Sequence, residues 1–206
     1  MHDSFAQIRT VVAAGVLLVL LAWEIGHPFF EQFARDRQGW RKRGLHGAFN
    51  LGLGLLNALI VSVVFVGAWA AATTWTGASE FGLLNSVNPP SAVRWLAAIF
   101  LLDAWTYAWH WMNHAIPFFW RFHRLHHSDR AMDVTTATRF HTVEIAASSV
   151  LRLPVLILLG CRIDELAVYE ALLFACVQFH HANIALPERL DRALRWVIVT
   201  PFMHKV

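Results

Sequence analysis

Three stretches of this sequence are too long and too apolar to be typical of a soluble domain. Residues 11–30, 48–72 and 93–116 each reach the length at which a helix, rising 1.5 Å per residue, crosses a bilayer core of about 30 Å. Two further apolar stretches, 143–160 and 165–182, are separated by Gly160-Cys161-Arg162 and predict a helical hairpin. We therefore predict an all-α fold, a polytopic membrane helical bundle of about four to five spans.

The composition agrees with a membrane protein and excludes other classes. Hydrophobic residues make up 57% of the sequence and charged residues 15%, whereas soluble domains average about 45–50% and about 25%. The two cysteines are too few for a disulfide scaffold and are interpreted as free thiols. The net charge of +3 comes from basic residues beside the apolar stretches, so it does not indicate nucleic-acid binding.

Basic residues also predict the orientation of the bundle. They are concentrated in residues 31–47 and 117–142, whereas the loop at 73–92 contains Glu80 and no Lys or Arg. The positive-inside rule then places 31–47, 117–142 and the tail from 184 on the cytoplasmic side. We predict a multi-pass integral membrane protein with a His-rich cap on that side. No linker divides the sequence, so residues 1–92, the N-terminal transmembrane helices, and residues 93–206 are expected to form one integrated domain.

Histidines are the strongest indication of function. The protein has 12, and six of them lie within residues 110–141. Residues spaced three or four apart on a helix share one face, which brings together His110 with His114 and, separately, the box at 123–127. Clustered neutral imidazoles are good metal ligands, and this many exceed what one tetrahedral ion uses, which predicts two ions. The candidate ligands are His110, His114, His123, His126, His127, His141, His181 and His204.

Several functions are compatible with such a cluster. A zinc hydrolase would require Glu beside the first histidine as general base, but Trp111, Met112 and Asn113 lie between His110 and His114. A haem protein needs single histidines on facing helices rather than a tight box. A metal transporter would distribute polar residues through the membrane depth, whereas these histidines gather at one face. A histidine-rich membrane metal-binding protein, a zinc hydrolase and a metal transporter remain the alternatives to an oxidoreductase.

Four motifs together resemble the boxes of the fatty acid hydroxylase/sterol desaturase superfamily. They are His110-x-x-x-His114, His123-x-x-His126-His127, Arg139-x-His141-x-x-Glu144 and Phe179-x-His181-x-Asn183. The resemblance covers roughly residues 93–206. It implies a membrane-bound non-haem di-iron enzyme that uses two Fe ions and O2 to hydroxylate or desaturate a lipid. It further implies an electron donor that is ferredoxin- or cytochrome b5-like.

The resemblance also implies roles for residues around the ligands. Ligating imidazoles usually donate their second N–H to a carboxylate or a carbonyl. For this role we select Asp103, Asp129, Asp133, Glu144 and Asn183, with Asp103, Glu144 and Asn183 as the candidate site residues. Asp103 precedes His110 by seven residues, which is two helical turns. Thr142 stands where the family usually has Pro. Thr200-Pro201-Phe202-Met203-His204 resembles the start of the last family box, which continues with two more histidines. We therefore expect that box to be incomplete, and the protein to be truncated at its C-terminus and weakly active.

Overall fold

The computed structural model describes residues 2–205, with side chains from residue 11, and within that range it contains helices and no named strand. The predicted all-α class is therefore confirmed. The elements in order are α1 (His2–Gly26), α2 (Arg37–Ile60), the π-helix η1 (Val61–Phe65), α3 (Val66–Ala78), α4 (Leu83–Val87), α5 (Ser91–Ala115), α6 (Pro117–His127), the 3-10 helix η2 (Val134–Thr138), α7 (Thr142–Leu159), α8 (Ile163–His181), α9 (Glu188–Leu194) and α10 (Pro201–Lys205).

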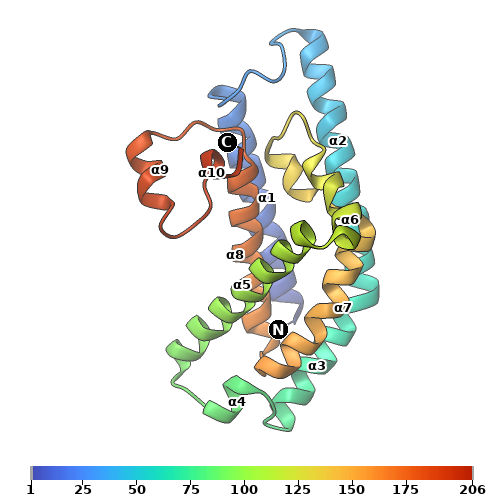
Figure 1. The fold of residues 1–206 in the computed structure, drawn as a ribbon, viewed down its shortest axis with the longest axis vertical. Coiled ribbons are helices and arrows are strands. Elements are labelled where there is room, and N and C mark those ends of the chain that lie inside the picture. The colour runs from blue at the N-terminus through green and yellow to red at the C-terminus, as the bar shows by residue number, and fades with distance from the viewer. Residues whose placement is uncertain (1, 206) are drawn as a thin grey trace.

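The long helices run up and down the longest axis of the molecule (Figure 1). Helix α2, η1 and α3 follow one another without a break, and α7 packs along them, while α1 packs against α8. Figure 1 shows the α1–α2 connection, α9 and α10 towards one end and α4 at the other. The segments predicted to be cytoplasmic are thus gathered towards the same end, although the side of the membrane they face remains a prediction.

Two helical segments in the described part of the protein are long and apolar enough to cross a membrane, Arg37–Val87 and Thr142–Leu159, and Val11–Gly26 is a shorter apolar helix. Large apolar side chains such as Leu55 and Val63 on the first of these segments are exposed. Exposed apolar surface of this extent is typical of contact with lipid rather than water. Helices α5 and α8 carry more polar side chains, so the predicted number of four to five crossings stays a prediction.

The end of the bundle opposite the histidines is joined by a buried ion pair and a close backbone contact. Arg94 on α5 donates to Glu165 on α8 at 2.6 Å and to the carbonyl oxygens of Leu84 and Gly160 at 2.9 and 2.8 Å. Gly160 ends α7 in the left-handed conformation, with φ of 68°. A Cβ on Gly82 would lie 2.4 Å from the nitrogen of Gly160, so the two turns approach too closely for any side chain.

An apolar cluster joins α1 to η2 and to the segment after α8. Leu20 from α1, Val134 from η2 and Ile184 after α8 are buried together in it. Helix α2 approaches η2 equally closely, because a Cβ on Gly54 would lie 2.6 Å from the Cβ of Thr138. Segments far apart in the sequence therefore meet immediately behind the histidine-bearing helices.

Candidate metal centre

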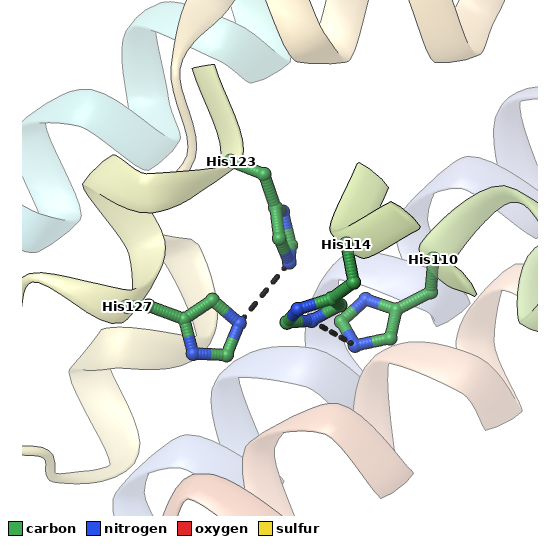
Figure 2. Close-up of side chains that lie close together, drawn as sticks. All are labelled: His110, His114, His123 and His127. Carbon is green, nitrogen blue, oxygen red and sulfur yellow. Dashed lines mark hydrogen bonds between the residues drawn. The ribbon is translucent and has the colours of Figure 1, made fainter. Parts of the chain in front are cut away.

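The first histidine group joins α5 to α6. His110 and His114 come from α5, His123 and His127 come from α6, and one ring nitrogen from each lies within 4.8 Å of the others. Figure 2 shows the four rings turned towards a common centre. The Nε2 atoms of His110 and His114 are 3.2 Å apart, as are those of His123 and His127. Pro117 starts α6 directly after α5, with Ile116 in an extended conformation between them, so the chain changes direction there and the two i, i+4 pairs face each other.

Glu144 orients one ring in this group and selects its tautomer. Its Oε1 accepts a hydrogen bond from Nδ1 of His123 at 2.7 Å, and both residues are buried. In the neutral ring, a proton on Nδ1 leaves the lone pair on Nε2. That lone pair is directed at Nε2 of His127. The predicted role of Glu144 as the carboxylate behind a ligating imidazole therefore has the required geometry.

The second group brings together His126 of α6, His181 of α8 and His204 of α10. Nε2 of His181 lies 2.8 Å from that of His126 and 3.1 Å from that of His204. The Nδ1 of His181 donates to the carbonyl oxygen of Val177 at 2.7 Å, so a neutral His181 has a single lone pair on Nε2. One in-plane lone pair accepts one N–H, yet two imidazole nitrogens lie within hydrogen-bond distance of it.

His126, His127 and His204 have lowered pKa values, which favour their neutral form. Burial lowers the pKa of His126 to about 2, and repulsion from His127, His123 and His204 adds to the effect. Partial burial of the His127 ring, followed by repulsion from neighbouring histidines, lowers its pKa to about 4. Burial followed by repulsion from Lys205 lowers the pKa of His204 to about 4. At neutral pH these rings present lone pairs rather than positive charges.

A metal ion resolves this arrangement of lone pairs. Hydrogen bonds cannot satisfy all three rings where two ring nitrogens face the one lone pair of His181. Neutral imidazoles instead bind a divalent ion at about 2.0–2.1 Å. The residues therefore fit two ions, one in each group. The groups are neighbours, because His126 lies between His123 and His127 on α6 and its ring centre is 5.5 Å from that of His123 and 5.1 Å from that of His127.

Some predicted site residues lie outside both groups. His141 is the N-terminal cap of α7, where its Nδ1 accepts from the backbone of Val143 at 3.1 Å. The amide of Asn183 bonds to the backbone of Phe30 at 2.8 and 3.0 Å rather than to a histidine ring. Asp103 is exposed on α5, and within the described residues it makes no hydrogen bond or ion pair through its side chain. The roles proposed for these three residues stay predictions.

Sequence reasoning selected Asp129 as a supporting residue but missed its partner, His46. His46 on α2 lies 2.9 Å from both carboxylate oxygens of Asp129, which also accepts from Thr136 at 2.7 Å. Interaction with His46 and Thr136 holds the pKa of Asp129 well below its usual range, against the opposing effect of burial. Because His46 and Asp129 are far apart in sequence, no local spacing indicates their contact. Arg139, another residue of the box motifs, bonds inward to Leu125.

The fold and the site together define a helical membrane protein with two adjacent histidine groups that are compatible with metal binding. The fatty acid hydroxylase family model matches residues 95–206, more than half of the sequence, so the protein belongs to that family. This membership confirms the resemblance found in the motifs and indicates an oxygenase-type enzyme. No curated protein and no solved structure matches the sequence.

Proposed function

We propose that this protein is a membrane-bound oxidoreductase that uses O2 to hydroxylate or desaturate a lipid, with one iron ion in each histidine group. The observation that carries the proposal is the pair of groups on α6, in which ring nitrogens of neutral imidazoles converge and, in the second group, the single lone pair of His181 faces two other ring nitrogens. Bound iron would supply the dioxygen chemistry that an unactivated C–H bond requires. The residues of the protein supply the ligands, their orientation and the surroundings.

The two groups differ in their access to the surface. His126 and His181 are buried, and the ring of His126 is stacked on Phe140 with 4.4 Å between ring centres. In the first group, His110, His114 and His127 are exposed. We infer that the lipid approaches this open side, because the exposed side chains of Tyr107, Trp111 and Phe118 lie on the same helices.

Asp103 is our candidate for contact with the polar part of the substrate. A carboxylate within an apolar span is costly and normally has a partner, yet this one bonds to no other side chain in the part of the protein that the structure describes. It lies about 10 Å along α5 from His110, given a rise of 1.5 Å per residue. A lipid hydroxyl or amino group at a similar distance from the reacting carbon would satisfy it. This favours a lipid with a hydrogen-bond donor over a simple hydrocarbon.

The electron donor is proposed to bind from the cytoplasmic side. Arg121, Arg124 and Arg130 are exposed around α6 and have no acidic partner among the described residues. Such a surface suits an acidic partner, ferredoxin- or cytochrome b5-like, because complementary charge steers association. The orientation follows from the positive-inside rule, and the protein is proposed to be multi-pass with its histidine boxes on that side.

The test is metal and product analysis of the full-length protein purified from membranes. We expect close to two Fe per molecule, and labelled oxygen in a lipid hydroxyl or in water when the protein is supplied with ¹⁸O2, a reductant and a membrane lipid extract. His126→Ala should lower both the metal content and the turnover. His27→Ala, at an exposed histidine outside the groups, is the matched control. One Zn per molecule, with no oxidised lipid, would refute the proposal and favour a zinc hydrolase.

A further inference from the structure

Glu24 of α1 is a buried carboxylate bonded to three other segments of the protein. Its exposed fraction is 0%. One oxygen, Oε2, accepts from the backbone N–H groups of Asn183 at 2.9 Å and Val134 at 3.1 Å. The other, Oε1, accepts from the guanidinium of Arg43 on α2 at 2.7 Å. A buried charge is tolerated when it is paired and hydrogen-bonded, as it is here. Replacing one carboxylate oxygen with an amide NH2 leaves either Arg43 or the two backbone N–H groups without an acceptor.

Two of the segments that Glu24 joins lie next to helices that supply the second histidine group. Asn183 follows His181 by two residues, and Val134 begins η2, to which a short loop connects His126. The backbone around His204 is attached to the same loop, because Lys205 donates to the carbonyl oxygen of Met132 at 2.6 Å. Glu24 therefore bonds to the backbone beside His181 and to the start of η2, next to the loop residue that Lys205 contacts.

The first histidine group has no comparable dependence on α1. Its four ligands come from α5 and α6, which follow each other in the sequence and present two i, i+4 pairs. Glu24, in contrast, lies outside residues 95–206, the region that the family model matches. A residue of the N-terminal helix thus bonds to the backbone two residues after His181, inside the matched region.

We propose that Glu24 is a positioning residue for the second metal. It holds the backbone after His181 and the start of η2 at a fixed separation, so that His181 and His126 face one another. Metal affinity of the second group therefore depends on α1, whereas that of the first group does not. This inference rests on the proposed occupancy of both groups.

The test is a Co²⁺ titration of the full-length protein in detergent, after removal of metal with a chelator, followed by visible absorption and by elemental analysis. The parent protein is expected to bind two equivalents. Glu24→Gln should lower the affinity for the second equivalent about 10–100-fold, the usual effect of losing a group that orients a ligand, and leave the first unchanged.

Glu165→Gln is the matched control, since Glu165 is equally buried and ion-paired but lies at the opposite end of the bundle. It should lower thermal stability and leave both equivalents in place. Arg43→Gln provides a milder second variant, because it keeps the carboxylate and removes the ion pair. It should weaken the second equivalent in the same direction as Glu24→Gln, and it also tests the inference if that variant does not fold.

The outcomes separate this inference from the proposed function. Selective loss of the second equivalent in Glu24→Gln and Arg43→Gln supports the positioning role. Unchanged binding in both variants overturns it. It is also overturned if Glu24→Gln loses both equivalents together and Glu165→Gln, destabilised to the same extent, loses both as well. A parent protein that binds no second equivalent refutes the proposed function together with the inference.

Discussion

Replacement of Arg94 by Met tests the architecture away from the histidines. The guanidinium donates to Glu165 and to two backbone carbonyl oxygens, and all of these bonds are buried. Met keeps much of the side-chain volume but removes every donor. Breaking a buried ion pair from one side costs about 3–5 kcal/mol, and each carbonyl left without a donor costs about 1–3 kcal/mol. Because Arg162 still interacts with Glu165 at 3.2 Å, we expect a loss of about 3–5 kcal/mol in the free energy of unfolding.

The assay is equilibrium unfolding in mixed detergent micelles, compared with the parent protein. Arg35→Met is the control, since Arg35 pairs with Glu31 in an exposed i, i+4 contact, and should change stability by less than about 1 kcal/mol. The double variant Arg94→Met with Glu165→Met should lose less than the sum of the two single variants, because it leaves neither charge buried without its partner. A loss below about 1 kcal/mol for Arg94→Met would refute the reasoning.

Three further variants test local features. Glu144→Gln should weaken metal binding about 10–100-fold at the first group, measured by chelator competition, because His123 loses the carboxylate that orients it; unchanged affinity would contradict this. His141→Ala should keep two metals per molecule and lose about 1 kcal/mol from the missing cap, whereas loss of one metal in elemental analysis would identify His141 as a ligand. Gly160→Ala should lower stability by about 1–3 kcal/mol in the same micelles without changing metal content, because φ is 68° there; an unaltered unfolding curve would argue against that conformation.

Local periodicity in the sequence predicted the long helices, one turn between them and the first histidine group. Apolar runs located the long helices, and the turn at 160–162 between α7 and α8 lies where Gly160 predicts it. The i, i+4 spacing of His110 and His114 and of His123 and His127 anticipated the first group. In each case the interacting residues are neighbours on one helix, so their spacing alone determines that they share a face.

Contacts between distant parts of the sequence could not be predicted from residue spacing. His141 belongs to a recognisable box, yet its place before α7 makes it a helix cap, and capping by a histidine has no strong sequence signal. The pairing of His46 with Asp129 joins segments 83 residues apart. Nothing in the spacing of either residue encodes the tertiary packing that brings α2 to the loop after α6.

The two histidine groups therefore depend on different levels of the structure. The first is specified by helix geometry and one sharp turn at Pro117, so it forms wherever α5 and α6 form. The second requires α6, α8 and α10 to pack together. Residues that are not ligands help to hold them in place, among them Glu24, which accepts from the backbone of Val134 and Asn183. Contacts of high sequence separation form only when the rest of the bundle is ordered. Damage anywhere in α1 or α2 should then appear first as loss of metal from the second group, before the first is affected.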